Sequence, residues 1–152
     1  MKKLYRVLFA LSIQLLLSAP SFAWYDRHLE RVEDASELFV ENFNKKDSAA
    51  LGEFYTRSGA LKLPGTSAVA GRHNVVDAWQ AGFDGGLDFL VLKAEGARRT
   101  SRNTVLENGR YELTIQTPGG SIIQRGTFSV LWRVPANPHR SPKIIFDAID
   151  AD

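Results

Sequence analysis

Apolar and polar residues alternate along the stretch from Val105 to Ile115. Its odd-numbered positions are mostly apolar and its even-numbered positions mostly polar, a period of two that predicts a long half-buried strand. Two odd positions interrupt the apolar row. Gly109 has no side chain to pack, so it marks a bulge, a bend or a close approach of another group. Glu107 puts a carboxylate on the inward face, where burial is costly unless the group is paired or protonated. A bent strand with an inward-facing acid predicts a sheet curved around a cavity.

Apolar residues recur every three or four positions in the first half of the chain, which predicts helices. The first is expected over Trp24 to Asn44, with charged residues on its solvated side. A second, short helix is expected to begin at Asp47, a good N-cap residue, and to end at Gly59. A third is expected after Gly71. The inward-facing residues of the last two helices are expected to be Leu51, Phe54, Tyr55, Val75 or Val76, Trp79 and Phe83.

The second half of the chain predicts strands. A short strand over Ala60 to Leu63 comes early and is stopped by Pro64-Gly65. Four more are expected from Leu87 onwards, the second and third joined by a turn at Pro118-Gly119-Gly120: Phe89 to Ala97, Thr104 to Gln116, Ser121 to Val134 and Lys143 to Ile149. Helices first and strands afterwards indicate an α+β domain, with three N-terminal helices packed on one face of a curved, mainly antiparallel sheet. We expect Thr104 to Gln116 at the centre of that sheet.

The first 23 residues have the features of a cleavable signal peptide. Lys2, Lys3 and Arg6 precede an apolar run, and Ser21-Phe22-Ala23 ends with the small residues that signal peptidase requires. The run is shorter than the roughly 20 residues that span a bilayer. The sequence therefore predicts a single domain over residues 24–152, located in the periplasm or secreted, with no membrane association after cleavage.

Removing the signal peptide changes the charge balance. The chain carries a net charge of +2, and residues 1–23 hold three positive and no negative side chains, so the remaining 129 residues carry −1. That balance does not favour nucleic-acid binding. The chain has no Cys, which excludes thiolate metal sites and thiol catalysis. The three His residues lack metal-ligand spacing, and no phosphate-binding loop or serine nucleophile elbow is present. We therefore expect neither a metal nor a cofactor.

Short motifs in a fixed order give the chain a family resemblance. It resembles the SnoaL-like branch of the nuclear transport factor 2-like superfamily over essentially all of residues 24–152. The resemblance implies a cone-shaped fold, usually dimeric, in which three helices and a curved sheet enclose a pocket. The matching positions are Phe54-Tyr55, Leu63-Pro64-Gly65, Gly71-Arg72 with Val75, Val76 and Trp79, Glu107-x-Gly109-x-Tyr111, Gly126-x-Phe128 with Trp132-Arg133, and Lys143-Ile144.

Three positions depart from what the resemblance implies. The related steroid isomerases have an Asp just before the Pro that ends the first strand, where this chain has Leu63. Their oxyanion-hole Tyr on the first helix corresponds to Phe39. The family's usual Trp before the last strand is replaced by Pro142. The first two departures argue against that isomerase chemistry, and the third suggests a remodelled closing edge.

Glu107 is the best single candidate for a functional residue. It can act as a pocket acid or base with a raised pKa. The alternative is an ion pair with Arg72, Arg125 or Arg133. Tyr111 and His73 are the other catalytic candidates, and either could act with Glu107, although a His at a helix start is more commonly a surface residue.

A second set of candidates concerns ligand binding. Asp147 and Asp150 could reach the mouth of the pocket, or they could simply lie at an exposed strand end. Aromatic residues at helical or strand spacing can line a ligand cavity or form plain core. The ligand-binding candidates are Tyr55, Trp79, Phe83, Phe128, Trp132 and Asp147.

Three functions remain open from the sequence. The leading one is non-catalytic binding of a small, largely apolar ligand or a protein partner. The second is acid–base catalysis by an isomerase, dehydratase or cyclase that uses a pocket carboxylate. The third is assembly alone, with the pocket filled by side chains. Ile123 and Leu131 interrupt an otherwise polar outward row, which predicts a homodimer through the outer face of the sheet.

Overall fold

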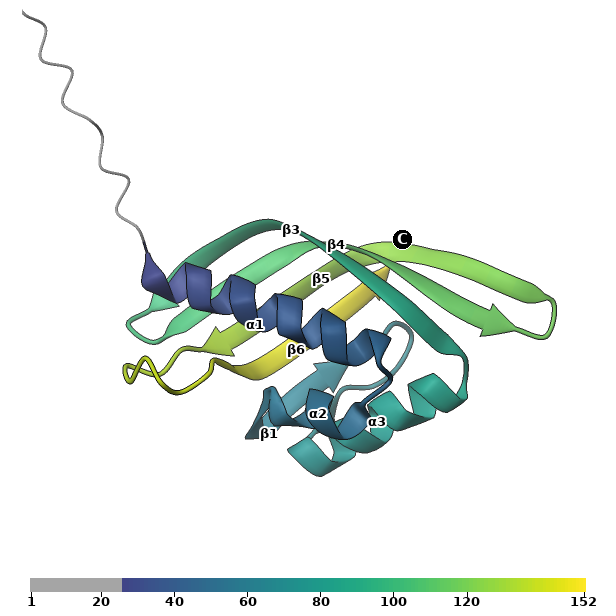
Figure 1. Ribbon diagram of the computed structural model, residues 1–152, viewed down its shortest axis with the longest axis horizontal. Coiled ribbons are helices and arrows are strands. Elements are labelled where there is room, and N and C mark those ends of the chain that lie inside the picture. Colours follow the sequence, from purple (N-terminus) through teal and green to yellow (C-terminus); the bar gives the residue numbers. More distant parts are fainter. Residues whose placement is uncertain (1–25) are drawn as a thin grey trace, which may run out of the picture.

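The computed structural model describes residues 26–152 (Figure 1). The expected signal peptide and the first two residues after it lie outside the described residues. Within the described range the chain forms three helices and six strands. In chain order they are α1 (Arg27–Asn44), α2 (Ser48–Glu53), β1 (Tyr55–Lys62), β2 (Val69–Ala70), α3 (Arg72–Asp84), β3 (Leu87–Ser101), β4 (Thr104–Thr117), β5 (Gly120–Arg133) and β6 (Lys143–Ala151).

The strands form one curved sheet in the order β2-β1-β6-β5-β4-β3 (Figure 1). Strands β1 and β6 pair in parallel, and every other pair is antiparallel. The predicted α+β class with a mainly antiparallel sheet is confirmed. The prediction that β4 lies at the centre is wrong, because β4 is second from the edge. The last strand inserts between β5 and β1, and strand order along the chain gives no sign of that insertion.

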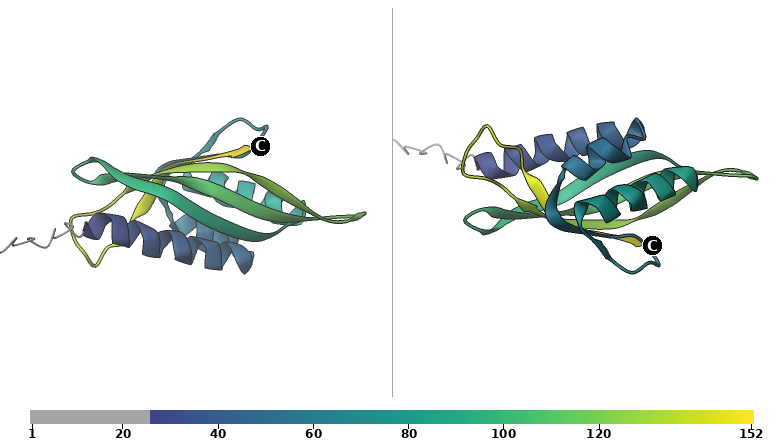
Figure 2. Two further views of the ribbon diagram at one scale, coloured as in Figure 1. Left: turned by 90° about the horizontal axis from the view of Figure 1, so that it is seen from above. Right: turned by 90° about the horizontal axis from the view of Figure 1, so that it is seen from below.

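Helix α1 begins at Arg27, three residues later than predicted. Asp26 is its N-cap, and its side chain accepts a hydrogen bond from the His28 backbone N–H at 2.9 Å. The helix runs along one side of the sheet, against β3 and β4 (Figure 2). Its buried stripe follows helical spacing and consists of Val32, Ala35, Phe39 and Phe43.

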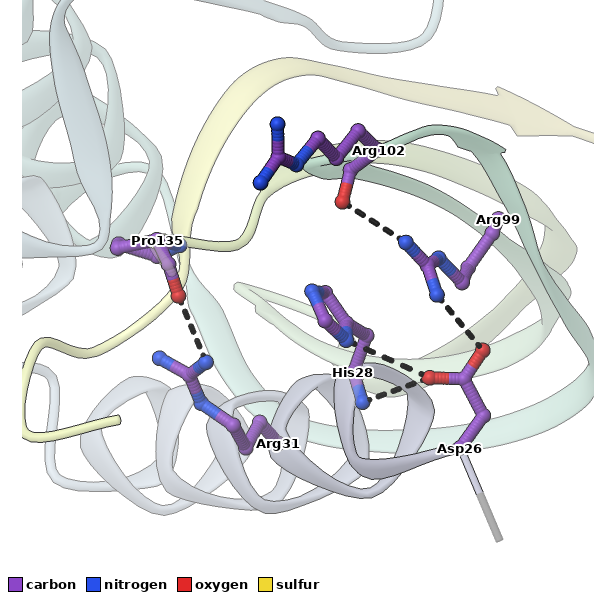
Figure 3. A network of polar contacts seen from close by, with 6 residues as sticks. All are labelled: Asp26, His28, Arg31, Arg99, Arg102 and Pro135. Atoms are coloured by element: carbon purple, nitrogen blue, oxygen red, sulfur yellow. Dashed lines mark hydrogen bonds and ion pairs between the residues drawn. The ribbon is translucent and has the colours of Figure 1, made fainter. Parts of the chain in front are cut away.

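A polar network anchors the start of α1 to two loops (Figure 3). The carboxylate of Asp26 lies 3.8 Å from the Arg99 guanidinium, which in turn donates to the carbonyl oxygen of Arg102 at 2.9 Å. Arg31 donates to the carbonyl oxygen of Pro135 at 2.8 Å. The network therefore joins α1 to the β3–β4 turn and to the segment after β5. Because these groups are partly exposed, their value lies in positioning the helix rather than in stability.

The segment after α2 differs from the prediction. Asp47 caps α2 as expected, accepting from the Ala50 N–H at 2.9 Å. However, β1 begins at Tyr55, so Gly59 lies inside a strand and does not end a helix. A Cβ on Gly59 would lie 2.8 Å from the carbonyl oxygen of Ile144 in β6. Glycine is needed there because the backbones of β1 and β6 approach closely.

The three helices are not consecutive along the chain, since β1 and β2 lie between α2 and α3. Helix α3 matches its prediction, with Val75 and Trp79 buried. Strands β3 and β6 extend beyond their predicted ends. None of the described helices combines the length and the apolar character needed to cross a membrane.

Strand β4 has the predicted register. Val105, Glu107, Tyr111 and Leu113 are buried, while the even-numbered residues are exposed or half-buried. A Cβ on Gly109 would lie 2.1 Å from the Lys93 carbonyl oxygen and 2.8 Å from the Phe128 ring. The pairing with β3 shifts register between Ala94 and Gly96, directly opposite. Gly109 therefore marks both a close backbone approach and an irregularity in the sheet.

Candidate functional site

A cavity of about 370 Å³ lies between the inner face of the sheet and helices α1 and α3. Its walls come from both helices, from strands β3 to β6 and from the segment after β1. They are mainly aromatic and aliphatic, and this volume falls within the range of small-molecule sites. Phe39 and Leu63, two apolar residues singled out in the sequence, both line it. The third function considered from the sequence required a filled interior, and this interior is hollow.

Asp147 is the one charged side chain in the cavity wall within the described residues. It is only 4% exposed, and it accepts a hydrogen bond from the Tyr55 hydroxyl at 2.7 Å. Burial raises the pKa of Asp147 to about 7, against the lowering effect of the Tyr55 hydrogen bond, and nearby Glu107 raises it further. Burial and the Asp147 charge in turn hold the pKa of Tyr55 well above its ordinary value. At neutral pH the Asp147 carboxyl can therefore exchange a proton.

Glu107 is 3% exposed and is held by neutral donors. Its Oε2 accepts from Ser36 Oγ and from Trp132 Nε1, each at 2.9 Å. Burial raises its pKa, the two hydrogen bonds oppose that rise, and the charge of Glu33 adds to it.

The sequence left open an ion pair between Glu107 and an arginine, and the structure contradicts it. Arg72 contacts Glu53 at 3.1 Å, and Arg125 contacts Glu112 at 2.9 Å. No ion pair joins Glu107 to any arginine, Arg133 included, in the part of the chain that the structure describes.

Glu107 faces a space different from the one that Asp147 faces. It lines a groove of about 530 Å³ between α1 and β3, and it does not line the cavity. Ser36, Leu90, Leu92 and Phe128 line both spaces, so the cavity and the groove are neighbours. The structure therefore puts the best sequence candidate in a neighbouring site, while Asp147 takes the position that we expected for Glu107.

Two buried donors in the cavity wall have no hydrogen-bond partner within residues 26–152. They are the indole Nε1 of Trp79 and the hydroxyl of Tyr111. Trp79 Nε1 lies near the Tyr55 hydroxyl without reaching hydrogen-bond geometry. Burial raises the pKa of Tyr111, so its hydroxyl stays protonated at neutral pH.

The aromatic candidates divide between wall and core. Trp79, Phe128 and Trp132 line the cavity. Tyr55 is fully buried behind the wall, and Phe83 packs edge-on against Phe43 at 5.0 Å between ring centroids.

Two of the remaining candidates lie outside the cavity. The His73 side chain is 89% exposed near the start of α3, with Asp77 at 3.5 Å, and the structure does not bring it to Glu107 or Tyr111. Asp150 is exposed and pairs with Lys62 at 2.8 Å. No group of three or more His, Cys, Asp or Glu side chains is arranged to hold a metal ion anywhere in residues 26–152.

Ser36 is the contact that sequence reasoning missed. It lies on the buried stripe of α1, four residues after Val32 and three before Phe39. A polar residue in an apolar stripe was the signal, and its hydrogen bond to Glu107 explains why a serine is accommodated there.

Several solved structures share this architecture. A ketosteroid isomerase-like protein from Erwinia carotovora atroseptica superposes with a TM-score of 0.73 at 20% identity, covering 84% of this chain and 98% of its own. A proposed dehydratase of the nuclear transport factor 2-like family from Streptomyces avermitilis gives 0.70 at 14% identity, covering 84% and 97%. An uncharacterized protein with a cystatin-like fold from Caulobacter vibrioides gives 0.70 at 13% identity, covering 82% and 89%.

The sequence comparisons find no such similarity. No protein-family model matches this sequence, and no curated protein shows significant sequence similarity to it. At these low identities the likeness to the solved structures concerns the fold.

Proposed function

We propose that this protein, which has the nuclear transport factor 2-like fold, binds a small and largely apolar ligand in its cavity. The observation that carries the proposal is the cavity of about 370 Å³, whose wall is mainly aromatic and aliphatic and holds one charged side chain among the described residues, the buried Asp147. An apolar ligand body would fill this space, and a carbonyl or hydroxyl oxygen on it would accept a hydrogen bond from the protonated Asp147 carboxyl.

The charged groups of the cavity wall further restrict which ligands could bind. Asp147 already accepts from Tyr55, and its raised pKa keeps it partly protonated near neutral pH. No described Lys or Arg lines the cavity, so an anionic ligand would lack a counter-charge. We therefore favour a neutral ligand with an apolar body and one or two oxygen atoms.

Ligand retention under native purification tests the proposal. The protein is isolated from cells without denaturant, extracted with organic solvent and analysed by mass spectrometry. Leu63→Trp narrows the cavity, whereas Leu38→Trp adds the same bulk on the exposed side of α1. We expect a neutral compound to be retained by the wild type and by Leu38→Trp and lost from Leu63→Trp. Retention of the same compound by Leu63→Trp would contradict cavity binding.

A second candidate function is acid–base catalysis at the same cavity. It is supported by one observation, the position of the Asp147 carboxyl in the wall with a pKa of about 7, which suits a general base or acid. In this hypothesis Asp147 takes the role that the sequence suggested for Glu107. Incorporation of deuterium from D₂O into the retained ligand distinguishes the two functions. An enzyme should replace a C–H hydrogen of the ligand with deuterium, and the Asp147→Asn variant should lose that activity. A protein that only binds the ligand should incorporate no deuterium into it.

The cellular setting belongs to the same proposal. The lysine-rich start, the apolar run and the small residues at Ser21-Phe22-Ala23 support export to the periplasm or beyond. The outer face of the sheet carries a cross-strand row formed by Phe89, Thr114 and Ile123. Phe89 is 52% exposed and Ile123 is 56% exposed. We propose that a second copy of the chain covers this row by two-fold pairing of the sheets.

A further inference from the structure

The groove between α1 and β3 is a second concave site, which adjoins the cavity at Ser36 and Phe128 and at two residues of β3. Val40 of α1 and Leu90 and Leu92 of β3 supply its apolar walls. The carboxylates of Glu33 and Glu37 stand on the α1 side, and Glu107 closes the inner end. No lysine or arginine lines this groove, so three acidic groups face a partly apolar space without a counter-charge.

Glu107 supplies the observation that points to a ligand. Both donors that hold it, Ser36 and Trp132, bind the same oxygen, Oε2. Oε1 has no hydrogen-bond partner in residues 26–152. The fully enclosed, unpartnered side-chain atoms of this range are Arg72 Nε, Trp79 Nε1 and Tyr111 Oη. Glu107 lines this groove and does not line the cavity. A carboxylate 3% exposed, with one oxygen held by two donors and the other without a partner in the described residues, is a preorganised acceptor.

Three basic residues on or just after α1 have other partners. Lys45 pairs with Glu41, and Lys46 pairs with Asp88 at 2.6 Å. Arg31 donates to backbone carbonyls of the segment after β5. None of these cations is placed to neutralise Glu107, and burying a carboxylate without a positive partner is unfavourable.

The edge of β3 adds a further polar feature. Asn44 bonds to both backbone groups of Leu90, donating to its carbonyl oxygen at 3.1 Å and accepting from its N–H at 2.7 Å. In a strand, the backbone groups of residues two positions apart point the same way, so the N–H and carbonyl oxygen of Leu92 point outward from the free edge of the sheet, as those of Leu90 do. An ammonium group has three donors and gains from several convergent acceptors.

We propose that this groove binds a primary amine with a short apolar arm, the ammonium group pairing with Glu107 Oε1 and the arm lying against Phe128, Leu92 and Val40. Glu33 and Glu37 raise the local concentration of the cation. The groove and the cavity share the walls formed by Leu90, Leu92 and Phe128, but the charged group proposed to bind the amine is Glu107, which does not line the cavity.

Matched small probes test the charge requirement. We compare 2-phenylethylamine, 2-phenylethanol and 3-phenylpropionate by isothermal titration calorimetry at pH 7 and low salt. We expect the amine to bind at least tenfold more tightly than the alcohol and the carboxylate not to bind. Equal binding of amine and alcohol, or no amine binding up to 10 mM, which is about the weakest affinity such a small probe would show, would overturn the proposal.

Variants locate the site. Glu107→Gln keeps the size of the side chain and should weaken amine binding at least tenfold. Glu112→Gln removes an exposed carboxylate from the opposite face of β4 and should leave amine binding unchanged. If Glu107→Gln does not fold, the double variant Glu33→Gln/Glu37→Gln, which changes exposed α1 residues, should still weaken the amine several-fold. Asp147→Asn separates the two sites: amine binding that survives it supports the groove, and amine binding lost with it means that the amine occupies the cavity instead.

Discussion

Glu107 and Asp147 lie on the same side of the sheet, one on each side of Val130, in a single cross-strand row through β4, β5 and β6. Two strand spacings separate their backbones by roughly 10 Å. Each carboxyl is buried, each accepts from neutral donors, and the charge of Glu107 contributes to the raised pKa of Asp147. The two acids are therefore electrostatically linked although they face different spaces.

Asp147→Asn should change how stability depends on pH. The pKa of Asp147 is about 7 in the folded protein and about 3.9 when unfolded, so folding favours the bound proton. Its ionisation therefore lowers the free energy of unfolding as pH rises from about 4 to 7. Asparagine can still accept the Tyr55 hydrogen bond, and it cannot ionise. The free energy of unfolding of the variant should therefore exceed that of the wild type by up to about 4 kcal/mol at pH 8 and equal it near pH 4. Urea unfolding at several pH values measures this, with Asp150→Asn as the exposed control; parallel wild-type and variant curves would show that Asp147 is not desolvated.

Tyr55→Phe should raise the pKa of Asp147 above its present value of about 7. The Tyr55 hydroxyl donates to Asp147 Oδ2 at 2.7 Å and stabilises the ionised carboxylate, which lowers the pKa. Carboxyl ¹³C chemical shifts followed by NMR against pH report the change. Tyr111→Phe removes a hydroxyl with no partner in residues 26–152 and should leave the Asp147 titration where it is. An unchanged or lower Asp147 pKa in Tyr55→Phe would mean that the hydrogen bond does not form in solution.

Glu107→Gln and Glu107→Ala should have opposite effects on stability near pH 7. The carboxylate has no cationic partner in the described residues, so the neutral Gln can accept from Ser36 and Trp132 without the cost of burying a charge, and stability should be equal or higher. Alanine leaves both donors unsatisfied and opens a cavity, which should cost about 2–4 kcal/mol. Thermal unfolding compares the three proteins. A clear loss of stability in Glu107→Gln would point to a cation that holds Glu107 in solution.

Gly109→Ala should be strongly destabilising. Its Cβ would fall 2.1 Å from the Lys93 carbonyl oxygen, a backbone atom that cannot move without breaking the β3–β4 pairing. We expect a loss of about 2 kcal/mol or more. Gly119→Ala lies in the β4–β5 turn, where the nearest atom within reach is 3.9 Å away, and it should change stability little. Similar denaturation midpoints for the two variants would contradict the close approach.

Ile123→Lys should shift the protein towards a monomer. The change puts a charge into the exposed apolar row that we propose a second copy covers, and an unpaired buried charge strongly disfavours an interface. Sedimentation velocity at tens of micromolar compares the wild type, Ile123→Lys and Ala49→Lys, which adds the same charge on α2. A wild type that is already monomeric at this concentration would count against the sheet-to-sheet dimer.

The sequence predicted some parts of this structure well for a clear physical reason. Strand β4 is half-buried, so its alternation fixed both its face and the inward direction of Glu107. The N-cap at Asp47 and the buried stripe of α1 were predictable in the same way, because both depend on residues close together in the sequence.

The failures arise where the information is not local. In β6, Ile144, Ile145 and Phe146 are all apolar, so the pattern could not say which face Asp147 would take or which strands would flank it. Gly59 was assigned to a helix end because only the distant carbonyl of Ile144 explains it. The cavity and the groove are each lined by residues from several distant elements, and no periodicity encodes which of these elements meet.

The insertion of β6 between β1 and β5 also governs the order in which the chain can fold. The β3–β4–β5 meander uses local contacts and can form early, but β1 must wait for a partner that follows it by about ninety residues. Until the last residues are free, β1 and β5 both present open strand edges, a state prone to aggregation. Such a long loop closure is slow. A chain that emerges from a ribosome or a translocation channel with its N-terminus first therefore cannot complete its sheet until synthesis or transport has ended.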